Sequence, residues 1–141
     1  MSGRVVVTGV GAEPLDPGAL LASVEDPAAG AAVSFVGRVR DHDGGRTVTA
    51  LEYHEHPSAA TVVAGIAEEI AARDGVVAVS VVHRTGLLDI GGIAIVAAVS
   101  AAHRSEAFIA CTDLVDEVKR RLPVWKRQVF DDDTDEWVGS A

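Results

Sequence analysis

Apolar residues recur along the chain in short runs rich in β-branched side chains, and such runs predict strands. They cover residues 4–10, 31–40, 47–53, 76–84, 93–100 and 124–130. The runs at 76–84 and 93–100 are almost continuously apolar, which is typical of central strands that are covered on both faces. Gly37 lies inside the second run, where it predicts a bulge.

A polar segment with two adjacent glycines, residues 41–46, separates the second run from the third. Its composition is typical of a flexible loop. The strands at 31–40 and 47–53 are therefore expected to form a hairpin whose mobile tip carries Arg40 and Arg46.

Apolar residues spaced three or four apart predict three helices. A short helix follows an Asp-Pro cap at residues 16–17, and a second runs from Pro57 to a stop at Gly75. The last helix begins near His103 and ends before Pro123. Helices and strands interleave without a strict βαβ repeat, so we expect an α+β fold with a mainly antiparallel sheet and packed helices.

The chain has 141 residues, of which 48% are hydrophobic and 23% charged, and this predicts one globular domain over residues 1–141. The net charge of −9 disfavours general binding to nucleic acid or to an anionic membrane. No apolar run approaches the roughly 20 residues of a membrane span, and the N-terminus lacks the apolar stretch of a signal peptide. A single cysteine cannot form an internal disulfide, so we expect a cytoplasmic location.

The basic residues of this acidic protein are clustered along the chain. Five of the 12 lie within nine positions: Lys119, Arg120, Arg121, Lys126 and Arg127. Two other element ends also carry cations: Arg38, Arg40 and Arg46, and the pair His103-Arg104. A local positive site in a negative protein suits a small anion, and the backbone N–H groups of a helix start suit phosphate. The alternative is that these cations simply decorate helix ends.

The chain contains only two lysines against ten arginines, and both lysines lie in the cluster of five. Lys119 is at the border of the apolar face of the last predicted helix, where partial burial would depress its pKa. Lys126 lies beyond Pro123 on an extended segment and would approach the same pocket from another direction. Two such amines can act as base, acid or covalent nucleophile.

Other candidate chemistry is weaker. His42, His54 and His56 could be drawn as a metal site, but they lack the helical HExxH spacing and no cysteine cluster accompanies them. Cys111 lies mid-helix among apolar residues, which favours a buried core thiol. The acidic run at residues 131–136 is expected to be a solvated turn.

Several short motifs, taken together and in order, resemble one family. They are Phe35-Val36-Gly37-Arg38-Val39-Arg40, Leu51-Glu52-Tyr53, His83-Arg84-Thr85-Gly86, Ala102-His103-Arg104-Ser105, Lys119 with Pro123-Val124-Trp125-Lys126-Arg127, and Trp137-Val138. Over about residues 31–138 the chain resembles the large, catalytic subunit of molybdopterin synthase.

The resemblance implies a fold of the α/β-hammerhead type and a sulfurtransferase of molybdenum cofactor biosynthesis. Such enzymes convert cyclic pyranopterin monophosphate (precursor Z) to the dithiolene molybdopterin. The sulfur comes from the C-terminal thiocarboxylate of a small ubiquitin-like subunit, whose tail inserts into a pocket of the large subunit. The family assembles as a homodimer of large subunits within a heterotetramer, and neither a cofactor nor a metal is expected.

Carried over by motif, Lys119 and Lys126 are the expected catalytic lysines. The expected substrate-binding residues, around the pterin phosphate and the carrier's tail, are Arg38, Val39, Arg40, His103, Arg104, Arg127 and Gln128.

Two rival functions stay open on the residue pattern. A non-catalytic module could grip an anionic peptide tail with the same cations, and it would tolerate Lys119→Arg. A metal-dependent hydrolase would use His42, His54 and His56 and would bind zinc stoichiometrically.

Overall fold

The computed structural model describes residues 3–139, and this part of the chain forms three helices and nine strands. In chain order they are β1 (Arg4–Gly11), α1 (Pro17–Ser23), β2 (Ala31–Arg38), β3 (His42–Asp43), β4 (Arg46–Glu55), α2 (Ala59–Ala71), β5 (Val76–Arg84), β6 (Gly86–Asp89), β7 (Ile93–Ala101), α3 (Arg104–Arg121), β8 (Val124–Phe130) and β9 (Asp135–Val138). None of these helices is long and apolar enough to cross a membrane.

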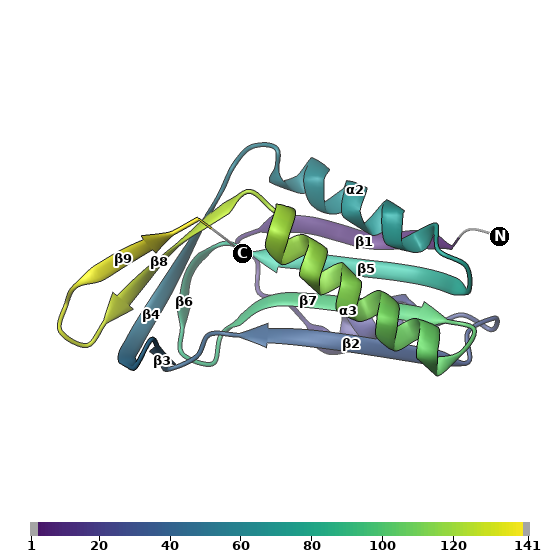
Figure 1. The fold of residues 1–141 in the computed structure, drawn as a ribbon, viewed down its shortest axis with the longest axis horizontal. Helices are drawn as coiled ribbons and strands as arrows, with labels where there is room; N and C mark the ends of the chain where they lie inside the picture. The colour runs from purple at the N-terminus through teal and green to yellow at the C-terminus, as the bar shows by residue number, and fades with distance from the viewer. Residues whose placement is uncertain (1–2, 140–141) are drawn as a thin grey trace.

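Four strands form the larger sheet, in the order β1-β5-β7-β2 (Figure 1). β1 runs parallel to β5, whereas β5 and β2 both run antiparallel to β7. Helices α2 and α3 cover one face of this sheet, and the short α1 packs on the other. The predicted α+β class and the mainly antiparallel pairing are thus confirmed.

The smaller sheet lies at one end of the larger one (Figure 1). Its strands follow the order β3-β4-β8-β9, and β6 pairs with the other edge of β4. Leu122 and Pro123 alone separate the end of α3 from the start of β8. Because the chain turns so tightly there, the last turn of α3 lies next to the smaller sheet.

The core lies between the larger sheet and helices α2 and α3. Eight of the nine residues of β7 are buried, and α3 adds the fully buried Leu114 and Val118. The central position of β5 and β7 confirms what their continuous apolar runs predict, because strands covered on both faces have no polar side.

The helix boundaries have local causes. The Asp16 carboxylate accepts a hydrogen bond from the Ala19 N–H at 3.1 Å, and Pro17 occupies the first turn of α1. Beyond α2 the backbone reaches φ +83° at Gly75, a left-handed conformation that glycine adopts without strain.

The hairpin predicted between residues 31–40 and 47–53 is wrong. β2 pairs with β7, whereas β4 pairs with β8 and β6, so the two runs belong to different sheets. The predicted bulge is present as a register shift between Gly37 and Arg38, beyond which the chain leaves the larger sheet. Closeness along the chain favoured the hairpin, but β2 instead pairs with the edge of β7, and α3 packs on β2.

Two polar segments also carry more regular structure than predicted. Within residues 41–46, β3 pairs with the start of β4 around a Gly44-Gly45 turn, at which both glycines have positive φ. The acidic run at residues 131–136 is a turn only at its start, because β9 begins at Asp135 and pairs with β8.

Candidate active site

A polar cavity of about 180 Å³ lies where the end of β2, the end of α3 and the smaller sheet meet. Its lining residues are Arg38, Val39, Arg40, His42, Leu51, Tyr53, Lys119, Lys126 and Gln128. Six of the nine predicted site residues are therefore brought together: Arg38, Val39, Arg40, Lys119, Lys126 and Gln128.

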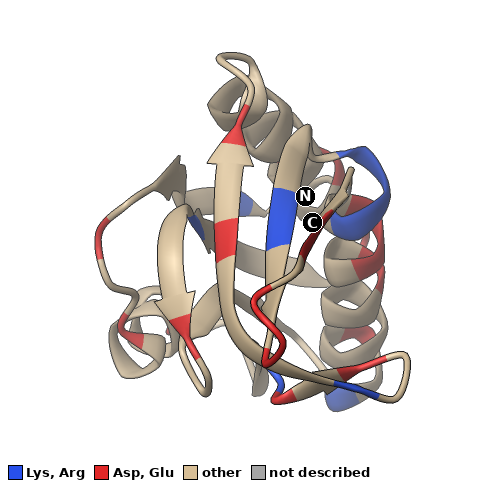
Figure 2. Ribbon diagram, turned by 90° about the vertical axis from the view of Figure 1, so that its left-hand side faces the viewer, with Lys and Arg blue, Asp and Glu red and all other residues tan. Residues whose placement is uncertain are grey.

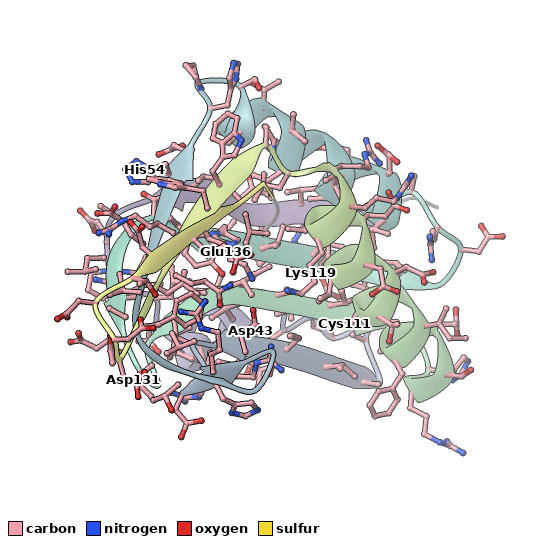
Figure 3. All side chains as sticks on the ribbon, turned by 60° about the vertical axis from the view of Figure 1, so that its left-hand side comes forward. Asp43, His54, Cys111, Lys119, Asp131 and Glu136 are labelled. Atoms are coloured by element: carbon pink, nitrogen blue, oxygen red, sulfur yellow. The ribbon has the colours of Figure 1, made fainter. Side chains whose placement is uncertain are left out.

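The two lysines enter this cavity from different elements. Lys119 lies in the last turn of α3, next to the buried Val118, and extends toward the smaller sheet (Figure 3). Lys126 lies on β8 opposite Tyr53 of β4, and strand alternation places Gln128 on the same face. The tight turn between α3 and β8 is what brings the two amines together.

The surroundings of Lys119 disfavour its charged form. Partial burial lowers the pKa of Lys119 below the ordinary lysine value, and the positive charges of Lys126 and Arg40 lower it further. A larger fraction of this amine is therefore uncharged near neutral pH than in a free lysine, so it is better able to accept a proton or to attack a carbonyl.

Carboxylates hold many of the cations outside the cavity, and Figure 2 shows how widely the acidic residues are spread over the fold. Arg121 pairs with Glu69 at 2.8 Å and with Glu117 at 3.2 Å, and Arg120 also pairs with Glu117. Neither lysine forms such an ion pair within residues 3–139. The acidic body thus neutralises arginines elsewhere and leaves both amines of the cavity available.

Tyr53 and His83 form a buried pair of rings beside the cavity. Neither residue was among the predicted site residues. Tyr53 lines the cavity, and its ring meets the His83 ring edge-on at a centroid separation of 4.8 Å. His83 donates its Nδ1–H to the Arg84 carbonyl at 2.8 Å, while burial and the charge of Lys119 lower its pKa to about 4. The imidazole is therefore neutral at pH 7 and adds no charge beside Lys119. The available signal was that His83 is the only titratable residue in the apolar stretch 76–83.

Arg127 does not line the cavity, contrary to the prediction. It lies between Lys126 and Gln128 in β8, so its side chain points to the opposite face of the strand. There it donates to Glu52 at 3.3 Å and to Asp135 at 3.1 Å. Side chains alternate between the two faces of a strand, so a site that contains Lys126 and Gln128 would have been predicted to exclude Arg127.

His103 and Arg104 lie at the start of α3, at the opposite end of this helix from Lys119. His103 is the N-cap residue and Arg104 the first helical residue, and both are exposed. Sixteen residues at about 1.5 Å each separate His103 from Lys119, a span of roughly 24 Å. Within one chain, this pair and the lysines therefore do not share a site.

The three histidines of the metal-hydrolase alternative are dispersed. His42 lines the cavity, whereas the His54 ring packs against Trp137 at 5.3 Å and the His56 ring against Trp125 at 6.3 Å. Among residues 3–139, no three His, Cys, Asp or Glu side chains are arranged to hold a metal ion. This geometry gives the alternative no support.

Cys111 faces the core from α3, as the sequence predicts. It is 3% exposed, and burial raises the pKa of its thiol to about 11. The thiol is therefore protonated at neutral pH, so Cys111 does not act as a thiolate nucleophile.

A small polar cavity that gathers two amines and two guanidinium groups on an α+β scaffold defines an enzyme-like site for an anionic substrate. The MoaE protein family model matches residues 10–121 of the chain. Molybdopterin synthase catalytic subunit 1 of Mycobacterium tuberculosis is 41% identical over 129 residues, which are 90% of this chain and 86% of that protein.

Solved structures share the fold. Molybdopterin synthase from Staphylococcus aureus superposes with a TM-score of 0.84 at 32% identity, over 92% of this chain and 95% of that one. A complex of subunits 1 and 2 of the molybdopterin-converting factor from Helicobacter pylori contains a chain with a TM-score of 0.71 at 20% identity, over 94% of this chain and 88% of that one. The chain belongs to the MoaE family, the catalytic subunits of molybdopterin synthase.

Proposed function

We propose that the cavity performs sulfur transfer from the C-terminal thiocarboxylate of a small ubiquitin-like subunit to precursor Z, which yields the dithiolene of molybdopterin. The observation that carries this proposal is the convergence of Lys119 and Lys126, without carboxylate partners among residues 3–139, in one cavity of a MoaE-family protein.

The charged residues of the cavity have two different roles, anion binding and support of the transfer step. The thiocarboxylate and the substrate phosphate are both anions, so the guanidinium groups of Arg38 and Arg40 and the ammonium of Lys126 hold them. Lys119, whose pKa is lowered, supports acyl or proton transfer at the thiocarboxylate. Local attraction at this site outweighs the repulsion that a net charge of −9 exerts on an anionic tail.

The cavity of one chain is small for these substrates. Pockets for small organic ligands usually measure about 300–1,000 Å³, whereas this one measures about 180 Å³. A second copy of the chain would enlarge it and bring its own His103 and Arg104 to the phosphate. This arrangement accounts for two predicted site residues that lie roughly 24 Å along α3 from Lys119.

An exposed apolar surface near the start of α3 supports this homodimer. Phe108 and Ile109 are 60% and 58% exposed, and a groove beside them is lined by Phe35 and Cys111. β2 is also an edge strand of the larger sheet, so one side of its backbone is free to meet another chain. We assign this face to the second large subunit and propose that two small subunits complete a heterotetramer.

We also place the protein in the cytoplasm. Cys111 is a free, buried thiol, which is typical of a chain that folds in a reducing compartment.

Substitution of Lys119 tests the proposal. Lys119→Ala should abolish dithiolene formation from precursor Z and thiocarboxylated small subunit, while binding of the small subunit, measured by calorimetry, persists. Arg120→Ala is the matched control, because it removes the neighbouring cation outside the cavity and should keep turnover. Near-full turnover of Lys119→Ala would refute the role of this amine.

A further inference from the structure

The hairpin formed by β3 and the start of β4 is joined directly to β8 by a hydrogen bond beside the cavity. The Nε2 amide of Gln128 donates to the Oδ2 atom of Asp43 at 2.9 Å. Gln128 is only 4% exposed, and Asp43 lies next to the tight Gly44-Gly45 turn. This bond crosses from the hairpin to a strand with which β3 itself does not pair.

The hairpin and the segment that leads into it from β2 carry part of the cavity wall. Val39, Arg40 and His42 line the cavity together with Lys119 and Lys126. The Asp41 carbonyl accepts from the Val48 N–H at 2.8 Å, which closes the base of the hairpin but does not reach β8. Val39 is anchored by backbone hydrogen bonds to Gly91 and Gly92, and the Thr47 carbonyl accepts from the Asp131 N–H at 3.1 Å just beyond β8. Between these two anchors, the contact with Gln128 helps to set where Arg40 lies over the cavity.

Asp43 makes two polar contacts of unequal strength. Its ion pair with Arg40 spans 3.5 Å between side chains that are 67% and 44% exposed, and exposed pairs of this kind are weak and screened by salt. Its bond to Gln128 is part-buried, and a buried carboxamide that loses its partner is left unsatisfied. Arg40 can thus leave Asp43 for an incoming anion while Asp43 stays bonded to Gln128.

We propose that Asp43 and Gln128 are a pair of positioning residues, whose hydrogen bond holds the hairpin over the cavity so that Arg40 is free to bind the anionic substrate. This inference rests on the proposed sulfur-transfer function only for the identity of that substrate.

The charge of Asp43 suits this role. The hydrogen bond from Gln128, followed by the positive charges of Lys126 and Arg40, lowers the pKa of Asp43 below its ordinary value. The carboxylate is therefore ionised at neutral pH and accepts from the amide. Gln128→Glu would put a second carboxylate against it, whereas the exchange Asp43→Asn with Gln128→Glu keeps one amide, one carboxylate and the same total charge.

The sequence allows this bond to be observed without an activity assay. Gln128 is the only glutamine in the chain, which contains no asparagine, so one pair of side-chain amide signals is expected in a ¹H–¹⁵N spectrum of the full-length protein. Asp43→Ala should move that pair toward the shifts of a solvent-exposed carboxamide. Asp41→Ala removes the same charge two residues away and should leave the pair in place. An unchanged pair in Asp43→Ala would overturn the inference.

The exchange of charges tests the positioning role in the working enzyme. With thiocarboxylated small subunit, Gln128→Glu should raise KM for precursor Z about tenfold with a smaller change in kcat, because Arg40 is displaced. The double variant Asp43→Asn/Gln128→Glu should return KM to within about threefold of the parent value. A double variant as impaired as Gln128→Glu would contradict the pairing. If the parent protein itself forms no dithiolene, the proposed function fails, while the amide signals still decide whether the bond exists.

Discussion

The two sheets of the molecule bury their strands to different degrees. Eight of the nine residues of β7 are buried in the larger sheet, whereas none of the four residues of β9 is buried in the smaller one. The larger sheet is covered by helices on both faces and packs small aliphatic side chains. The smaller sheet is tied by ion pairs, such as those of Arg127 with Glu52 and Asp135.

This difference means that the two sheets contribute differently to folding stability and to the active site. Burial of apolar surface is the main source of folding free energy, so the larger sheet stabilises the protein. The smaller sheet buries fewer residues than the larger one, and it presents polar side chains such as Lys126 and Gln128 to the cavity. Substitutions should therefore affect either the free energy of unfolding or turnover, according to the sheet in which they fall.

The largest expected effect is on turnover alone, in Lys119→Arg. The guanidinium keeps the positive charge but does not lose its proton, so general acid–base or nucleophilic work by this side chain stops. We expect dithiolene formation to fall by at least roughly a hundredfold, with an unchanged urea unfolding midpoint. A variant that retains binding and nearly full turnover would favour the non-catalytic binding module.

The next effect is on stability alone, in Leu114→Ala. Leu114 is fully buried in α3 against the larger sheet, and truncation of such a leucine costs about 2–5 kcal/mol. The matched substitution in the smaller sheet is Trp137→Ala, whose side chain is 56% exposed and whose loss should cost less than about 1 kcal/mol. Urea denaturation of both variants measures the contrast, and equal costs would remove the distinction between the sheets.

His83 lies at the boundary, because it is buried in β5 but touches the Tyr53 ring beside the cavity. Its pKa in the folded protein, about 4, lies below the ordinary value of about 6.5, so between these pH values the unfolded chain binds a proton that the folded chain does not. The free energy of unfolding should thus fall by roughly 1 kcal/mol for each pH unit from 6.5 down to 4. His83→Phe should remove this contribution, and a His83 ring signal that titrates near pH 6.5 would contradict it.

The smallest effect is expected at Arg127, which the sequence analysis placed in the site. Its guanidinium faces away from the cavity, and partly exposed ion pairs contribute about 0–1 kcal/mol. Arg127→Met should change turnover less than about threefold and unfolding by less than about 1 kcal/mol. Loss of turnover without loss of stability would return Arg127 to the catalytic machinery.

The positions of the helices and strands could be predicted from the sequence more accurately than the pairing of the strands. Residues 124–130 were predicted as a strand with its exact bounds, because a proline precedes it and apolar residues continue through it. The pairing of β2 with β7 was missed because an apolar run along the chain does not show which distant strand will pair with it. Only the tertiary fold brings residues 31–38 to β7.

The site was partly predictable for similar reasons. Lys119 and Lys126 stood out as the only lysines in the chain, and one tight turn was enough to bring them together. Tyr53 and His83 could not be found by charge, because their contribution is a buried, neutral contact between the two sheets. His103 and Arg104 fit the motif, although the predicted last helix, which begins near His103 and ends before Pro123, already separates them from Lys119 by roughly 24 Å.

The most direct test of the account is the titration of the two lysine amines. Reductive ¹³C-methylation of the full-length protein labels Lys119, Lys126 and the N-terminus, and Lys119→Arg assigns the Lys119 signal by its loss. We predict that this signal titrates below the ordinary lysine pKa of about 10.4, because burial and two neighbouring cations disfavour its charge. A Lys119 signal that titrates at or above the ordinary value would contradict a lowered pKa for this amine, and with it the proposed chemistry.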